Sequence, residues 1–426
     1  MTGSPAFRRM AVTVPPEEWF HGICHAIYRL YRAGLENLGC DIFDVPVLPF
    51  LTGDAARIAD LVNDLRLFRP EAAMGLHKGS LALICRMPPG EDGWRPNVFA
   101  DILDIPVICL WDHAPLELAN QLLQPYADGD DALRQLSASL AHPRLIHWSP
   151  DSGQTRLMRA LSLTGACPII HEGLPVLPGF APDASAAVKP GIGFVGHVYQ
   201  EAVQYSSPAL ENVAANCIRQ WLNSDGQPFW HFLANALPET GMTLNQTCVW
   251  KFAHRLTLHT AQTARRLRVL GSAAVPVTCY GDLRAGPEVP ANLVPVAADV
   301  PFGPELARVL AAHEIAIDVI NPGAIDGYSS KPLLAFAAGG FMLVDRKSDF
   351  VGAFGQAGEA ISYTADLAAK IDHFLSRPGA RREVGDDIRN TIRSRFRLED
   401  VLGRVLQKAR EAVSVRRLQP VRSRCY

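Results

Sequence analysis

Short apolar runs alternate with stretches of helical periodicity along most of this chain. The run Arg9–Val14 favours a strand, and apolar residues then recur at helical spacing from Glu17 to Leu38, where Gly39 ends the pattern. The same reasoning predicts, up to residue 175, strands over Asp41–Val47, Glu71–Leu76, Ile105–Leu110, Leu145–Trp148 and Pro168–His171, and helices over Ala55–Leu67 and Gln154–Leu163. Strands that alternate with helices imply a parallel sheet with right-handed crossovers.

A stretch without periodicity interrupts this alternation. Residues 176–190 are rich in proline, alanine and glycine, which is typical of an interdomain linker. Beyond it we predict strands over Ile192–Val195, Val275–Tyr280, Leu293–Val296, Ile315–Ile320, Phe341–Val344 and Ala360–Tyr363, two or three helices within 208–270, and helices over Leu367–Leu375, Ala380–Arg395 and Leu398–Val413. The predicted organisation is a Rossmann-like domain (1–175), a linker (176–190), a second Rossmann-like domain (191–396), a C-terminal helix (397–415) and a basic tail (416–426).

Length and composition agree with two folded α/β domains. A chain of 426 residues is too long for one ordinary core, and 48% hydrophobic with 20% charged residues is a globular composition. The formal net charge of −2 gives no basic field, so nucleic acid is not an expected partner. The tail residues Arg416, Arg417, Arg422 and Arg424 could contact a membrane surface or a partner, but a solvated terminus is the favoured interpretation.

The cysteines and the apolar runs indicate a cellular location. Nine cysteines without a CxxC pair argue against a disulfide framework and against a zinc site. No stretch approaches the roughly 20 apolar residues that span a bilayer, and no signal sequence is evident. We therefore expect a cytoplasmic protein without a transmembrane segment.

Two spacings suggest a metal at first sight. His21 and His25 have the HxxxH spacing but lack an acidic ligand, and Asp128-Gly129-Asp130 lies in a polar loop rather than at the end of an apolar strand. We expect no metal and no cofactor.

The most informative segment follows the predicted strand Ile315–Ile320. A glycine-containing loop, 321–328, leads to Ser329, Ser330 and Lys331 at the start of a helix. In open parallel sheets ligands bind beyond the carboxyl ends of the strands, where the backbone N–H groups of a helix start can receive an anion. The pattern predicts a phosphate site, whereas the plainer interpretation is a serine cap and a solvated lysine.

This segment resembles the group 1 glycosyltransferases of the GT-B fold, and within them the spore-maturation-protein-like (CgeB-like) branch. The family pattern is an acid, a glycine and an aromatic residue, then a second acid in a small apolar helix that ends in glycine. Asp326-Gly327-Tyr328 matches the first part and 334–339 the helix, with Leu334 at the place of the second acid. The similarity extends to Ile192–Tyr199, to Val277–Gly281 and, more faintly, to Pro106–Pro115.

The resemblance implies a bacterial, hexosyltransferase-like enzyme. It would transfer a sugar from a nucleotide-diphosphate-sugar, held mainly by the second domain, to a glycan, protein or small-molecule acceptor held mainly by the first. Two departures matter: the side chain of Leu334 cannot accept a hydrogen bond from ribose, and His197 and Tyr199 stand where many relatives have arginine and lysine. The leaving diphosphate would then depend on Lys331, His197 and the helix dipole.

The donor-binding residues implied by the resemblance lie at the ends of predicted strands. Asp326 would accept hydroxyls of the transferred sugar, and Tyr280 with Gly281 would contact the nucleobase, although Tyr280 suits a core edge equally well. The full predicted set is Gly196, His197, Tyr199, Tyr280, Gly281, Asp326, Gly327, Tyr328, Ser329, Ser330 and Lys331.

Inversion at the anomeric carbon would require a base that deprotonates the acceptor hydroxyl. Asp112 and His113 follow the apolar strand Ile105–Leu110 and are the catalytic candidates; a turn or a helix cap is the alternative. His77 and Lys78 are candidates for an acceptor or phosphate contact. In the catalytic interpretation, Asp112 or His113 faces the helix start at 329–331.

Two other functions compete with this prediction. The missing second acid is compatible with an inactive GT-B scaffold that binds a glycan or a partner. Residues 191–196 spell GxGxxG, which favours a dinucleotide-dependent enzyme, but the first glycines fall within the predicted strand rather than in the turn after it.

Overall fold

The computed structural model describes residues 5–18, 23–75, 96–123, 131–176, 189–199, 205, 207–224, 227–284, 289–296, 298 and 300–417. Several predicted features lie outside these residues or their described side chains. They are His21, His77, Lys78, the Asp128-Gly129-Asp130 motif, most of the predicted linker (177–188), the side chains of Tyr199 and Arg417, and the tail residues Arg422 and Arg424.

The first domain is built on a six-stranded parallel sheet in the order β2-β1-β3-β4-β5-β6. Its strands are β1 (Arg9–Val14), β2 (Asp41–Pro46), β3 (Ala72–Gly75), β4 (Val107–Leu110), β5 (Leu145–Ser149) and β6 (Ile169–His171), and β1 has the predicted bounds. The helices are α1 (Ile23–Asn37), α2 (Leu48–Thr52), α3 (Ala55–Phe68), α5 (Ala119–Leu123), α6 (Asp131–Leu140) and α7 (Ser152–Ala160), with a π-helical turn η1 (Val98–Ile102) and a 3-10 turn η2 (Pro115–Leu118). Both sides of β4 are fully buried, which explains its continuous apolar run.

The second domain repeats this plan, with a parallel sheet in the order β11-β9-β7-β12-β13-β14. Its strands are β7 (Lys189–Val195), β9 (Val277–Tyr280), β11 (Leu293–Val296), β12 (His313–Asp318), β13 (Met342–Asp345) and β14 (Ser362–Tyr363), and β8 (Val198–Tyr199) pairs separately with β10 (Leu283–Arg284). The covering helices are α12 (Pro304–Ala311), α13 (Ser330–Ala337), α14 (Ser348–Ile361), α15 (Leu367–Ser376) and α16 (Pro378–Arg395). The strand predicted from Ala360 begins only at Ser362, because α14 continues to Ile361.

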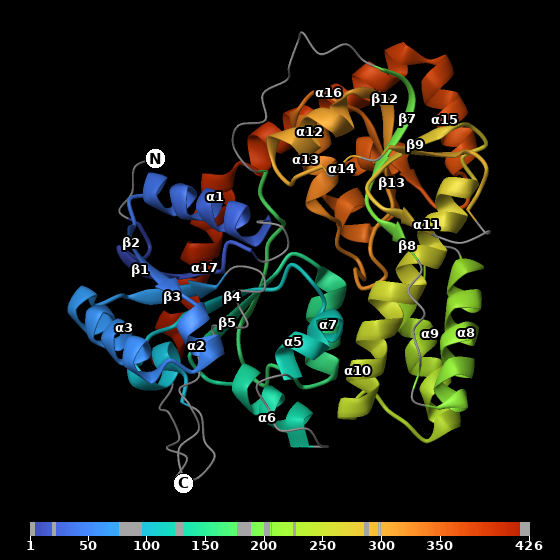
Figure 1. Cartoon of the computed structure of the whole chain (residues 1–426). Helices are drawn as coiled ribbons and strands as arrows, with labels where there is room; N and C mark the ends of the chain where they lie inside the picture. Colours follow the sequence, from blue (N-terminus) through green and yellow to red (C-terminus); the bar gives the residue numbers. More distant parts are fainter. Residues whose placement is uncertain are drawn as a thin grey trace.

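The predicted helical stretch within 208–270 is a set of helices that contacts the first domain. It contains α8 (Pro208–Leu222), α9 (Phe229–Ala236), η3 (Leu237–Thr240), α10 (Thr247–Arg255), the π-helical turn η4 (Leu256–Ala261) and α11 (Gln262–Gly271). Trp221, Trp230 and Trp250 belong to the same buried cluster as Ala11 and Phe99 of the first domain. Figure 1 shows α10 beside the helices of the first domain, and α10 contacts α5, α6 and η2.

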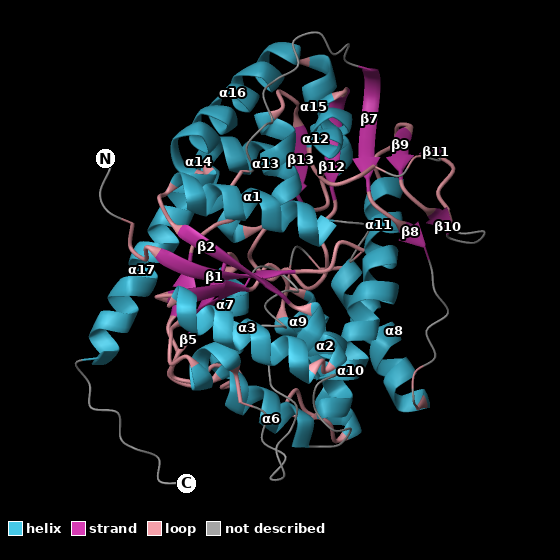
Figure 2. Ribbon diagram, turned by 60° about the vertical axis from the view of Figure 1, so that its left-hand side comes forward, coloured by secondary structure: helices cyan, strands magenta, loops and turns pink. Residues whose placement is uncertain are grey.

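The last helix, α17 (Leu398–Arg417), leaves the second domain and packs on α1, β5 and β6 of the first. Figures 1 and 2 show it crossing from α16 to the first sheet. Its buried Leu398 and Leu402 side chains lie against the backbone of Gly34 in α1. Arg404 and Lys408 of the same helix bind the Glu172 carboxylate at 2.9 and 2.8 Å. The packing of the first domain is therefore completed by α17, which is distant from it in sequence.

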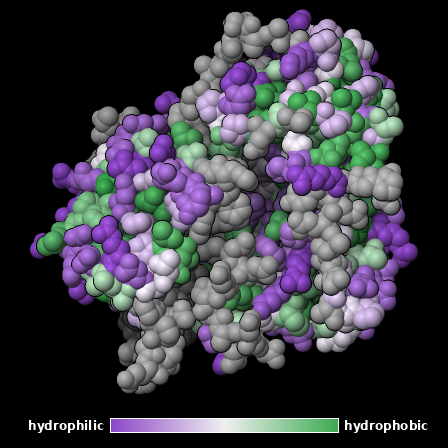
Figure 3. Space-filling model, viewed as in Figure 1, coloured by the Kyte–Doolittle hydropathy of each residue, from purple (hydrophilic) through white to green (hydrophobic). Residues whose placement is uncertain are grey.

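The predicted fold class is confirmed: two α/β domains with parallel sheets form the GT-B arrangement. The carboxyl ends of the sheets point toward each other, because Asp151, just after β5, binds the backbone of Ile325 and Asp326 in the loop after β12. Figure 3 shows hydrophilic and hydrophobic residues intermixed over both lobes. Among the described helices, none is both long and apolar enough to cross a bilayer.

Replacing Leu402 by alanine tests the packing of α17. Leu402 is fully buried, so Leu402→Ala should lower the free energy of unfolding by about 2–5 kcal/mol through lost contacts and a cavity. Thermal unfolding of the full chain measures the loss. The control, Leu67→Ala, makes the same chemical change at a side chain that is 81% exposed. Equal melting temperatures for the two variants would contradict the packing of α17 on α1.

Candidate active site

The loop between β12 and α13, residues 319–329, has a defined local structure. The buried strand β12 ends at Asp318, and the Asn321 side chain then accepts a hydrogen bond from the backbone N–H of Gly323 at 3.0 Å, which turns the chain. Ser329 is the N-cap of α13, since its Oγ accepts a hydrogen bond from the N–H of Lys331 at 3.3 Å. The same hydroxyl donates to the buried Asp318 carboxylate at 3.0 Å, which fixes the helix start over the end of β12.

Lys331 extends from this helix start to the end of the neighbouring strand β7. Its Nζ donates to the carbonyl oxygen of Val195 at 2.8 Å and lies 5.8 Å from the Phe194 ring centroid. Burial lowers the pKa of Lys331 to about 8, with the Asp318 carboxylate opposing the shift and the charge of Arg266 adding to it. Desolvation also raises the pKa of Asp318, and Lys331 opposes that rise. The ammonium group is therefore held at the end of β7 by the carbonyl oxygen of Val195.

Arg266 of α11 supplies a second positive charge that the sequence analysis missed. Its guanidinium group lies 5.8 Å from the Phe194 ring centroid, close to Gly196, and donates to the carbonyl oxygen of His197. Nothing in the motif indicates this residue, because it belongs to a helix 69 positions away from His197. Arg266 and Lys331 thus lie near the end of β7, where many relatives in the resembled family have an arginine and a lysine.

Asp326 is fixed by contacts from both domains. Its carboxylate accepts a hydrogen bond from Ser348 at 2.9 Å and pairs with Arg156 of α7, and its backbone N–H donates to the Asp151 carboxylate at 3.0 Å. Only glycine fits at position 327, since a Cβ there would lie 2.6 Å from the Cβ of Asp151. The matched motif therefore serves as the contact point between the domains.

A second buried lysine, Lys347, contacts the backbone of the loop between β12 and α13. Nζ of Lys347, just after β13, donates to the carbonyl oxygens of Ala324 and Ile325 at 2.9 and 3.2 Å. Desolvation lowers the pKa of Lys347, and the nearby carboxylates of Asp345 and Asp151 oppose the shift. The sequence analysis missed Lys347, whose only signal is its position directly after a strand.

Other predicted donor residues lie in different surroundings. Tyr280 is only 7% exposed, and its hydroxyl is 3.0 Å from Nε2 of His313, so its ring lies in the core rather than facing a nucleobase. Gly281 lies against the backbone of Gly196, and His197 is exposed with its Nδ1 accepting from the N–H of Asp282 at 3.2 Å. The Tyr328 ring packs edge-on against Phe350 and Phe354.

Leu334 is fully buried inside α13. The position where the family has its second acid therefore faces the core of the second domain. Ser330 directly follows the cap and begins α13.

The acceptor-side candidates follow β4 in the first domain. His113 Nδ1 lies 3.5 Å from Oε2 of Glu117, one helical turn further on. Glu117 is only 2% exposed, and its Oε1 has no hydrogen-bond partner among the described residues. A Cβ on Gly323 would overlap this carboxylate, so Glu117 touches the loop that precedes α13.

The Asp112–His113 loop therefore meets the second domain through Glu117. Asp112 lies near the buried Tyr31, whose pKa is raised by desolvation and by the charge of Asp112. His113 keeps 37% of its side chain exposed, and its Nδ1 edge faces Glu117. The sequence analysis missed Glu117, although its spacing of four residues from His113 was a visible signal.

Candidate metal ligands are not gathered at this site. Within the described ranges, no three histidine, cysteine, aspartate or glutamate side chains lie together as a metal site requires.

Residues 253–407 match a family model described as glycosyl transferase-like. No curated protein matches the chain in sequence. Solved structures similar in shape include an α-glucosyltransferase in complex with UDP and a 13-mer DNA (11% identity, 96% of this chain and 100% of that chain, TM-score 0.49). T4 phage BGT with its UDP-glucose substrate (8%, 96% and 98%, 0.47) and Anabaena HepE with UDP and glucose (11%, 96% and 100%, 0.43) are also similar. All three TM-scores lie below 0.5, so these likenesses are distant.

The family match covers the part of the chain that carries the pattern from Asp326 to Gly339. It begins within α10 and ends within α17, so it includes Arg266, the loop after β12 and the start of α13. Residues 253–407 are therefore a glycosyl transferase-like region of the chain.

Proposed function

We propose that this protein is a glycosyltransferase that holds the diphosphate of a nucleotide-diphosphate-sugar at the carboxyl end of β7. The observation that carries the proposal is the pair of cations there: Lys331 donates to the carbonyl oxygen of Val195, and Arg266 donates to that of His197. Backbone carbonyls are weaker partners for a cation than a diphosphate, so the donor can displace them. The start of α13 adds its free N–H groups and its dipole.

The same arrangement supports transfer without a metal ion. As the bond between the anomeric carbon and the diphosphate oxygen breaks, negative charge grows on the leaving group. The two positive charges and the start of α13 would stabilise that charge. The donor is a substrate, and we propose no further cofactor.

The donor sugar is proposed to lie over the loop 321–328, with its hydroxyls on the Asp326 carboxylate. Leu334 is buried, so other groups would hold the ribose. The exposed His197 is the proposed candidate, because Arg266 donates to its carbonyl oxygen. Tyr280 is not part of this proposal, because its ring is in the core.

His113 is the proposed base, with Glu117 as its positioning residue. A carboxylate next to Nδ1 favours the tautomer with its proton on Nδ1, in which Nε2 carries the lone pair that would take the proton of an acceptor hydroxyl, and it stabilises the imidazolium that forms. The oxygen of that hydroxyl then bonds to the anomeric carbon while the nucleotide diphosphate leaves. The acceptor, a glycan, a protein or a small molecule, would bind on the first domain.

We also propose the finer assignments that the sequence suggested: the CgeB-like branch, a bacterial cytoplasmic location, and the domain bounds 1–175 and 191–396. Their basis is the residue pattern from Asp326 to Gly339 and the cysteine usage.

A donor screen tests the proposed function. Binding and slow hydrolysis of UDP-, GDP-, ADP- and dTDP-sugars are measured in EDTA, because the proposal requires no metal. One donor should bind, and Lys331→Ala should weaken it by about 10-fold to 150-fold, the usual loss of about 1.5–3 kcal/mol for a charged hydrogen bond. Asp326→Ala should also weaken the sugar donor but spare the free nucleotide diphosphate. A folded protein that binds none of these donors would leave the inactive scaffold as the better interpretation.

Donor affinity should depend on pH through Lys331. Because burial lowers its pKa to about 8, the ammonium group loses its proton as the pH rises through about 8, whereas an ordinary lysine stays charged. The dissociation constant should be flat below that pH and about tenfold higher one unit above it. Lys331→Arg is the control, because arginine stays charged and should abolish this dependence. The same rise in the Lys331→Arg variant would assign the titration to another group.

Substitution of His113 should separate catalysis from donor binding. His113→Ala should lower turnover by about 10²-fold to 10⁴-fold, as expected for the loss of a general base, with donor affinity unchanged. Glu117→Gln should lower turnover less and shift the acidic limb of the pH–rate profile. Asp112→Asn is the matched control at the neighbouring carboxylate. A greater loss in Asp112→Asn than in His113→Ala would make Asp112 the base.

A further inference from the structure

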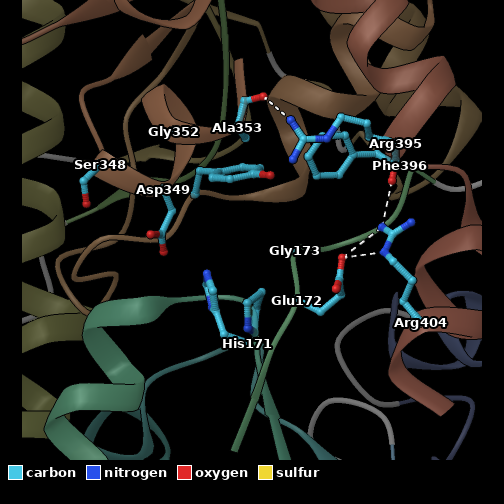
Figure 4. A pocket seen from close by; sticks show the side chains of 12 residues that line it. His171, Glu172, Gly173, Ser348, Asp349, Gly352, Ala353, Arg395, Phe396 and Arg404 are labelled. Atoms are coloured by element: carbon cyan, nitrogen blue, oxygen red, sulfur yellow. Dashed lines mark hydrogen bonds and ion pairs between the residues drawn. The ribbon is translucent and has the colours of Figure 1, made fainter. Parts of the chain in front are cut away.

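A separate pocket of about 310 Å³ lies where the chain passes between the domains; we call it the hinge pocket. Its first-domain wall comes from the end of β6 and the residues after it, and its second-domain wall comes from Tyr328 and α14. The end of α16 and the start of α17 complete it. The polar side chains that matter most are His171, Glu172, Tyr328, Asp349, Arg395 and Arg404. Figure 4 shows Ser348 and Asp349 on one side and Arg395 and Arg404 opposite them.

The charges that line the hinge pocket balance. Glu172 and Asp349 are acidic, and Arg395 and Arg404 are basic, so with a neutral His171 the formal sum is zero. The Glu172 carboxylate is bound by Arg404 and Lys408, and these cations lower the pKa of Glu172 although burial opposes them. The lining residues themselves therefore carry no net charge, and they offer a neutral ligand both donors and acceptors.

A hydroxyl-rich ligand fits this mixture best. Arginine and histidine N–H groups donate, carboxylate oxygens accept, and a hydroxyl does both. Tyr328 and Phe396 add ring surface next to these polar groups, as carbohydrate C–H groups require. The volume lies at the small end of the range of about 300–1,000 Å³ for small-molecule pockets, which limits the ligand to a short saccharide.

The hinge pocket is connected to the loop after β12. Asp349 accepts hydrogen bonds from the N–H and the hydroxyl of Ser152 in the first domain, at 2.8 and 2.7 Å. Its own N–H donates to the carbonyl oxygen of Asp326 at 3.0 Å, and Ser348 donates to the Asp326 carboxylate. A ligand in the pocket would therefore contact both domains and the residues that hold Asp326.

We propose that the hinge pocket is a second carbohydrate site, which binds one neutral monosaccharide unit separately from the donor nucleotide. Bound sugar bridges the two domains and favours the arrangement in which Ser152 and Asp349 are joined.

One wall of the pocket offers a direct test. Gly352 of α14 lines the pocket, and a Cβ at this position would meet no atom within 4 Å. Gly352→Leu should therefore fill the pocket without disturbing the helix, and Gly352→Ala is the matched control that leaves most of the space open. Thermal unfolding verifies that both variants fold; each should be at least as stable as the wild type, because glycine disfavours a helix.

Saturation-transfer NMR and calorimetric titration with glucose, galactose, mannose and N-acetylglucosamine, without nucleotide, measure the binding. At least one sugar should bind the wild type and Gly352→Ala, and its affinity should fall tenfold or more in Gly352→Leu. Binding of the donor nucleotide should be the same in all three proteins, which separates this site from the donor site. The proposal also stands independently if no nucleotide donor is found.

Three results would overturn the proposal. The first is that none of the four sugars binds the wild type. The second is that a sugar binds Gly352→Leu as tightly as it binds the wild type. The third is that inorganic phosphate displaces the sugar, which would make the pocket an anion site.

Discussion

One buried carboxylate, that of Asp151, determines how the two domains meet. It begins α7 by accepting from the N–H of Gln154 at 3.0 Å, and it accepts from the N–H groups of Ile325 and Asp326 across the boundary at 2.8 and 3.0 Å. Asp151 is 3% exposed, so loss of one of these partners would leave a buried carboxylate oxygen with fewer hydrogen bonds than it needs. The position of the loop after β12, and of everything that Asp326 touches, depends on this group.

The site also keeps its cations in place before any ligand arrives. Lys331 and Lys347 are held by main-chain carbonyl oxygens, while Arg265 is held by the buried Asp345 at 2.9 Å. Carbonyl partners satisfy the N–H groups but do not neutralise the charge. In the proposed function, the positive charge at the end of β7 would be in place for a diphosphate, and little rearrangement would be needed when negative charge develops.

Periodicity was sufficient to predict the architecture, because strand and helix patterns are local. The bounds of β1 and β11 match the prediction, and the loop before α13 lies where the strand, glycine and serine pattern placed it. Contacts between distant segments were not predictable: Asp151 and Ile325 are 174 positions apart, and the sequence around Arg266 gives no sign that it approaches Gly196. Tyr280 ends a strand as expected, but alternation alone does not tell which face of that strand is covered.

The return of α17 to the first sheet has a consequence for biosynthesis. The face of α1 around Gly34, which packs against Leu398 and Leu402, has no cover until the first turns of α17 have been made. The first domain is therefore made first but completed last, after the second domain has had time to fold. A chain stalled before residue 398 would present that uncovered surface to chaperones.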